Sequence, residues 1–69
     1  MDDTSTLVGA AAGADPEQGL RAVRALRELA DRLETLQVRR ARQLGWSWEH
    51  IAAALGVSKQ AAHKKHRKA

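Results

Sequence analysis

Basic and polar side chains gather at the C-terminal end of the chain, and they are the side chains with the clearest chemical use. Residues 58–68 contain five Lys or Arg, two His and one Gln, and no Asp or Glu. Such side chains donate hydrogen bonds to phosphate oxygens and to acceptor atoms on the edges of bases. Basic segments also serve solubility or bind membranes, but nucleic acid is the partner that we expect first.

Charge is unevenly divided along the chain. Residues 1–18 hold four acidic residues and no Lys or Arg, whereas residues 19–69 hold all 12 basic residues against four acidic ones. A chain of 69 residues can form one small domain with a modest core, and such domains often gain stability from a partner or from self-association. The composition therefore favours a compact basic domain with an anionic partner.

The segment 45–69 is predicted to contain two short helices joined by a tight turn. Ser47 and Ser58 are each placed to cap a helix, since a serine oxygen can accept from the unpaired N–H groups of a first turn. Apolar residues follow Ser47 at helical spacing. Gly56 stands where a chain leaving a helix often needs the left-handed conformation.

A resemblance to a known family rests on these residues. The run Ile51-Ala52-x-x-Leu55-Gly56-Val57-Ser58 resembles the core of bacterial helix-turn-helix domains. The stretch from Gly45 to Lys68, about a third of the chain, is similar to the promoter-reading C-terminal region of sigma factors and to short homeodomain-like regulators. Ala62 stands where the family usually has Val or Ile, and His50 where an acidic residue is usual. We expect an all-α fold in which a long N-terminal amphipathic helix precedes a helix-turn-helix, forming a three-helix DNA-binding unit.

In this geometry the second short helix enters the major groove of double-stranded DNA, with residues near its N-terminus facing the bases. The residues expected to face base edges are Ser58, Lys59, Gln60, His63 and Lys64. Those expected to contact phosphates are Arg39, Arg42, Lys65, His66, Arg67 and Lys68. Ser58 is explained more simply as a helix cap, and arginines also complement the dipole at a helix end. Protonated His63 and His66 would add charge beside phosphate.

Residues 15–44 are predicted to form the long helix, and residues 1–14 to be partly disordered or a short helix. Asp15 suits the N-cap position and Pro16 the first helical position, while Gly45 closes the helix. Apolar residues recur at spacings of three and four, which makes a heptad-like stripe opposite a charged face: Ala22, Leu26, Leu29, Leu33 and Leu36.

Only the last turns of this helix, roughly residues 33–44, are needed to cover the two short helices. The apolar side chains that remain are expected to pair with a second copy of the chain: Leu20, Val23, Leu26, Leu29 and Leu33. Alternatively, Leu7, Val8 and the neighbouring alanines fold back over this face, or another partner helix covers it.

The core is expected to form where the long helix meets the two short ones. Its predicted members are Leu36, Trp46, Trp48, Ile51, Ala52, Leu55 and Val57. Both Trp residues are assigned to the core because platforms on which nucleic-acid bases stack expose several aromatic residues on one surface.

The sequence has no pattern that indicates an enzyme: no Gly-rich phosphate loop, no nucleophile beside a base, and no carboxylate pair in a plausible cleft. Cysteine is absent, and three His without further ligands are not expected to bind a metal. We expect no cofactor and no pocket for a small molecule beside so small a core. With no long apolar run or export signal, the expected location is cytoplasmic and nucleoid-associated, without a membrane partner.

The sequence is therefore consistent with two functions. The first is double-stranded DNA binding by a small homodimer, which acts as a transcription regulator or a nucleoid-associated protein. The second is an adaptor that docks on RNA polymerase or another regulator through its long apolar helix and meets DNA only weakly.

Overall fold

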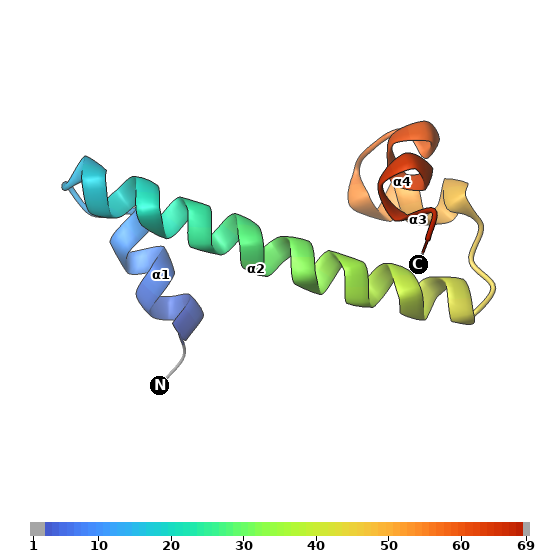
Figure 1. The fold of residues 1–69 in the computed structure, drawn as a ribbon, viewed down its shortest axis with the longest axis horizontal. Helices are drawn as coiled ribbons and strands as arrows, with labels where there is room; N and C mark the ends of the chain where they lie inside the picture. The colour runs from blue at the N-terminus through green and yellow to red at the C-terminus, as the bar shows by residue number, and fades with distance from the viewer. Residues whose placement is uncertain (1–2, 69) are drawn as a thin grey trace. The chain divides into compact units, whose positions relative to one another are not determined.

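The computed structural model describes residues 3–68 and, within that range, is all-helical, with four α-helices and no strand. The helices are α1 (Asp3–Ala11), α2 (Pro16–Gln43), α3 (Trp48–Leu55) and α4 (Lys59–His66) (Figure 1). The chain divides into two compact units, residues 1–32 and residues 33–69, and α2 runs through both. The expected all-α class is confirmed.

In the first unit, local signals set where α2 begins. The backbone N–H of Glu17 donates to Oδ1 of Asp15 at 3.1 Å, and the N–H of Gly19 donates to the Asp15 carbonyl at 2.8 Å. Pro16 is the first helical residue, where its missing N–H costs nothing because no helical partner exists for it. The predicted cap at Asp15 is confirmed.

The end of α1 lies against the first turns of α2. Gly19 is buried, and a Cβ placed on it would lie 3.6 Å from the Ala11 carbonyl oxygen and 3.7 Å from that of Ala10. Ala22, one turn further along α2, is also buried. Small residues at this contact let the two backbones approach closely, while Val8 of α1 stays 52% exposed.

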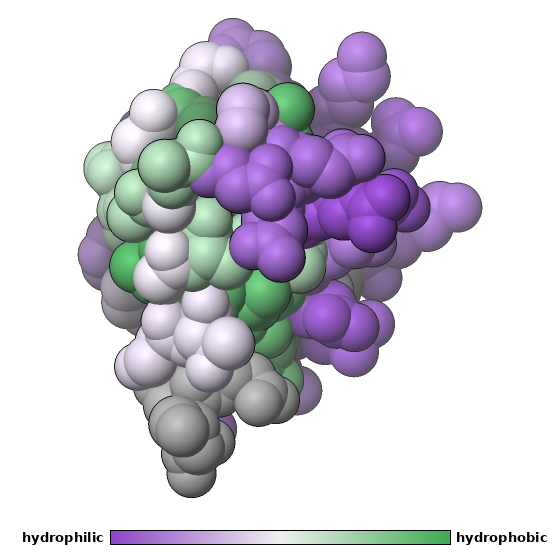
Figure 2. Space-filling view, turned by 90° about the vertical axis from the view of Figure 1, so that its left-hand side faces the viewer, coloured by the Kyte–Doolittle hydropathy of each residue, from purple (hydrophilic) through white to green (hydrophobic). Residues whose placement is uncertain are grey.

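The apolar stripe of α2 is covered unevenly. Val23, Leu26 and Leu29 are half-buried, whereas Leu20 is 70% exposed and Leu33 is 52% exposed. Figure 2 views the end of the chain that holds α1 and the start of α2, where hydrophobic and near-neutral residues gather on one side and hydrophilic residues on the other. None of the described helices is both long and apolar enough to cross a lipid bilayer.

In the second unit, two glycines end the helices that precede them. Gly45 has φ +86° and Gly56 has φ +73°, the left-handed region that L side chains rarely adopt. After Gly45 the Trp46 N–H donates to the Ala41 carbonyl, and after Gly56 the Val57 N–H donates likewise five residues back. Both ends are Schellman motifs, which satisfy carbonyls that the helix leaves unpaired.

Two serines begin the helices that follow these turns. Oγ of Ser47 accepts from the His50 N–H at 3.1 Å, and Oγ of Ser58 accepts from the Ala61 N–H, also at 3.1 Å. Both serines have extended backbone angles, as N-cap residues require. The predicted caps are confirmed, and α3 and α4 are separated by three residues, 56–58.

The core of the second unit is built from small and medium side chains. Its buried apolar members are Val38 of α2, Ile51 and Ala52 of α3, and Ala62 of α4. Trp46 and Trp48, predicted to be central, are half-buried at its edge. Ala62 is 2% exposed, so its small side chain lets α4 approach its neighbours closely.

Three residues predicted to lie in the core are exposed instead: Leu36 by 56%, Val57 by 47% and Leu55 by 36%. Leu36 is exposed because α3 and α4 cover a different face of α2. Leu36 and Val38 point about 200° apart on a helix with 3.6 residues per turn, and it is Val38 that is buried. The buried side of α2 therefore departs from the leucine stripe in this unit.

Candidate nucleic-acid interface

The surface of α4 that faces away from the core is polar and basic. Gln60, Lys64 and Arg67 are exposed and recur at spacings of four and three, so they share one side of the helix. The side chains of Gln60 and Lys64 make no hydrogen bond or ion pair with another residue of the described range 3–68. These side chains are therefore available to a ligand, while Ala62 on the opposite side is buried.

Lys59 and His63 lie nearer to α3. Lys59 Nζ is 3.6 Å from Glu49 Oε1, and both side chains are more than half exposed. The His63 ring meets the Trp48 ring edge-on, with 5.1 Å between the ring centres. An exposed ion pair of this kind contributes at most about 1 kcal/mol and can be exchanged for a stronger partner. Both residues remain accessible, but they also join α4 to α3.

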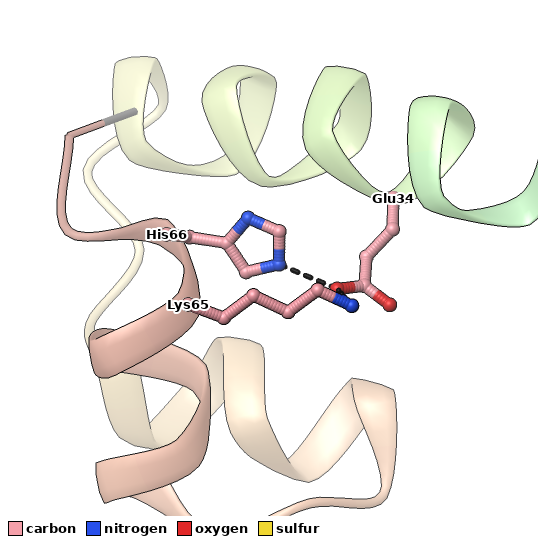
Figure 3. Close-up of polar contacts among 3 residues, drawn as sticks. All are labelled: Glu34, Lys65 and His66. Carbon is pink, nitrogen blue, oxygen red and sulfur yellow. Dashed lines mark hydrogen bonds and ion pairs between the residues drawn. The ribbon is translucent and has the colours of Figure 1, made fainter. Parts of the chain in front are cut away.

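His66 turns inward and bonds to α2. Its side chain is 4% exposed, and its Nε2 donates to Oε2 of Glu34 at 2.5 Å. Lys65 Nζ lies 3.1 Å from the same oxygen, so two neighbouring α4 residues converge on one carboxylate (Figure 3). His66, predicted to contact DNA phosphate, is instead buried against Glu34.

This cluster changes the acidity of its carboxyl group. The hydrogen bond from His66 is the largest influence and lowers the pKa of Glu34 below its ordinary value, while burial opposes it. The hydrogen bond and the positive charge of Lys65 lower the pKa of Glu34 further. Glu34 is therefore held as a carboxylate and stabilises the contact between α2 and the end of α4.

Arg42 is engaged at the connection between α2 and α3. Its Nη1 donates to the Trp46 carbonyl at 2.8 Å, and its guanidinium carbon lies 4.8 Å from the centre of the Trp48 ring. The Trp46 ring stacks on the His50 ring, with their centres 3.6 Å apart. Arg42, predicted to contact phosphate, thus has a structural role in fixing the residues that precede α3.

A small open pocket of about 230 Å³ lies where the end of α4 meets α2. It is lined by Thr35, Arg39, Lys65, His66 and Lys68. This pocket was not expected, because so small a core was predicted to leave no room for one beside it. Four of the residues predicted to contact phosphate are gathered around it, although His66 forms only a wall that is already bonded to Glu34.

The described residues contain no group of three or more His, Cys, Asp or Glu side chains that could hold a metal ion. His63 and His66 diverge, since the first is exposed beside Trp48 and the second is buried beside Glu34. These histidines therefore contribute to different surfaces of α4.

Glu34 and Thr35 were not predicted to belong to the site. The signal that identifies Glu34 is its position four residues before Val38, which puts both on one face of α2. That signal becomes readable only once Val38, rather than Leu36, is known to be the buried residue.

The chain matches no known protein-family model, no curated protein and no solved structure in comparisons with all three.

Proposed function

We propose that α3 and α4 form a helix-turn-helix that binds double-stranded DNA, with α4 in the major groove. The observation that carries the proposal is the exposed side of α4. Gln60 and Lys64 point to solvent and are not used in the fold, on a helix whose other side is buried through Ala62. A helix held in this way by capped turns presents its outer side chains in a fixed geometry.

The outer side chains suit base recognition. A Gln amide can donate to N7 and accept from N6 of adenine, and a Lys ammonium can donate to O6 and N7 of guanine. Gln60 lies in the first turn of α4 and Lys64 one turn later, so they would meet successive base pairs. Lys59 and His63 flank them and would add contacts on the side nearer to α3.

Phosphate contacts would come from the basic residues around this helix. Arg67 and Lys68 follow on the C-terminal end of α4, and Arg39 is exposed on α2 within the same unit. With five to eight phosphate contacts per copy, the logarithm of affinity would fall with the logarithm of salt concentration at a slope of about −4 to −7.

The protein is proposed to bind DNA as a homodimer. Leu33 and Leu36 are more than half exposed and continue the stripe of Leu29 at spacings of four and three. Burying one leucine contributes roughly 1.5–3 kcal/mol, so several of them per chain are enough to support self-association. In such a dimer, two copies of α4 would read a two-fold symmetric site as a transcription regulator or a nucleoid-associated protein.

The same exposed leucines favour a second candidate, an adaptor that docks on RNA polymerase or another regulator through α2. The two functions differ in their affinity for DNA. Fluorescence anisotropy with a labelled duplex should show binding at about 150 mM salt with the steep slope given above if the first proposal is right. An adaptor would show little binding to duplex under these conditions.

A further inference from the structure

The pocket at the end of α4 has a lining that suits one class of ligand. Three of its five lining residues, Arg39, Lys65 and Lys68, carry a positive charge, and none is acidic or apolar. Ligand pockets for larger organic molecules are mostly apolar and occupy roughly 300–1,000 Å³. This pocket is smaller, and the residues that line it are all polar or charged, so a small anion fits it better than an organic cofactor.

Two of the three cations are available to a ligand. Arg39 and Lys68 are exposed and have no ion-pair partner within residues 3–68. They come from different helical segments, since Arg39 lies on α2 and Lys68 lies in the turn after α4. An anion placed between them would be bound from two sides.

The third cation is held in place. Lys65 Nζ is 3.1 Å from Oε2 of Glu34, and Nε2 of His66 donates to the same oxygen (Figure 3). An anchored ammonium loses less side-chain freedom on binding a ligand than a freely rotating one. Glu34 thus orients Lys65 at the edge of the pocket, and its carboxylate partly offsets the positive charge of Lys65.

The volume suits a phosphate group. A water molecule occupies about 30 Å³ in the liquid, so a pocket of about 230 Å³ has room for a phosphate group together with a few waters. Arg39 can bind two phosphate oxygens through its planar guanidinium, while the two lysines act as point charges.

We propose that this pocket binds a single phosphate group, held by Arg39, Lys65 and Lys68. This inference rests on the proposed function in one respect: the phosphate is taken to belong to the DNA backbone. A phosphate bound there bridges α2 and the end of α4, and it fixes the position of the helix that reads the bases. The same chemistry would accept free inorganic phosphate.

The test is a titration of the ¹⁵N-labelled full chain with inorganic phosphate, at fixed pH and at an ionic strength held constant with chloride. The expected result is saturable shifts of the amide signals of Thr35, Arg39 and Lys68. Arg39→Gln and Lys68→Gln should each weaken the apparent affinity about tenfold, because each removes a charge-assisted hydrogen bond. Thermal unfolding of each variant checks that the fold is kept.

Arg40→Gln is the matched control. It removes the same charge from the neighbouring residue of α2, which is exposed but does not line the pocket. Affinity should change by less than about twofold, as expected of long-range electrostatics in salt. Shifts that do not saturate, or an equal loss in Arg40→Gln and Arg39→Gln, would overturn the proposal.

A second arm adds unlabelled duplex DNA to the phosphate-bound protein. Displacement of phosphate identifies the DNA backbone as the source, whereas duplex binding without displacement supports a site for free phosphate. A protein that binds phosphate in the pocket but binds no duplex would contradict the proposed function and leave the phosphate site standing.

Discussion

Lys64 and His66 lie two residues apart on α4 and serve opposite surfaces of the second unit. Lys64 is exposed and its side chain makes no polar contact with another described residue, whereas His66 is buried and bonded to Glu34. The basic C-terminal end therefore has two tasks. Some of its side chains hold α4 against α2, and the others are available to a ligand.

Glu34→Gln should lower the stability of the fold by about 1 kcal/mol at neutral pH, because a hydrogen bond to a charged acceptor becomes one to a neutral acceptor. The pKa of Glu34 is lowered in the folded state, so this contribution is present above the unfolded value and is lost as pH falls through the folded pKa. Urea unfolding of both proteins, repeated from pH 7 downward, should show the difference shrinking below about pH 4.5.

Glu28→Gln is the control for that experiment, since it removes the same charge from an exposed position of α2. Its effect should stay within about 0.5 kcal/mol at every pH. A Glu34 variant that matches the Glu28 variant across the pH range would show that the cluster with His66 contributes nothing to stability.

Gln60→Ala and Lys68→Ala should separate base recognition from phosphate contact. The first should reduce discrimination between duplex sequences by about 1–3 kcal/mol, because a bidentate contact to a base edge is lost. The second should weaken binding to all sequences alike and make the salt slope less steep. Affinity measured for a panel of duplexes checks both, and uniform losses in both variants would favour a nucleoid-type role without sequence recognition.

At the scale of the helices, the sequence was enough to predict the features that depend on neighbouring residues, namely the helix caps and the turns. Asp15, Ser47 and Ser58 cap helices and Gly56 ends one, because caps and left-handed turns depend on a few adjacent atoms. The face of α2 that becomes buried depends on where α3 and α4 dock.

The sequence shows that leucines repeat along α2, but it does not show on which face of α2 the helices α3 and α4 dock. The periodicity of α2 therefore pointed to Leu36, whereas Val38 is the buried residue. The hydrogen bond between His66 and Glu34 joins residues that are 32 positions apart, so no local sequence pattern predicts it. The sequence showed that the C-terminal end is basic, but it did not show which of the basic side chains are buried and which are exposed.

Gly56→Ala tests the turn between α3 and α4. A Cβ there meets no other atom within 4 Å, so the expected cost is purely conformational, about 1–2 kcal/mol for placing an L residue at φ +73°. Gly9→Ala makes the same change within helix α1, also in open space, and should stabilise the chain by up to about 1 kcal/mol. Thermal unfolding measures both, and a neutral Gly56 variant would contradict the role given to this turn.

At the scale of the whole molecule, the exposed leucines of α2 determine whether the protein acts alone. Leu33→Glu should convert a dimer into monomers, because Leu33 is 52% exposed in one chain and lies on the stripe proposed to meet its copy. Leu44→Glu is the control, since Leu44 is also exposed but lies beyond the end of α2. Sedimentation velocity gives the masses, and a wild type that is already monomeric at high concentration would refute the dimer.

The central claim is that the outer side of α4 lies against double-stranded DNA. The most direct measurement is a map of ¹H–¹⁵N shifts when a duplex selected from a random library is added to the full chain. We predict that the largest changes occur at Gln60, Lys64 and Arg67, including the side-chain amide of Gln60. Changes concentrated on the leucines of α2, or no saturable change at all, would contradict the claim.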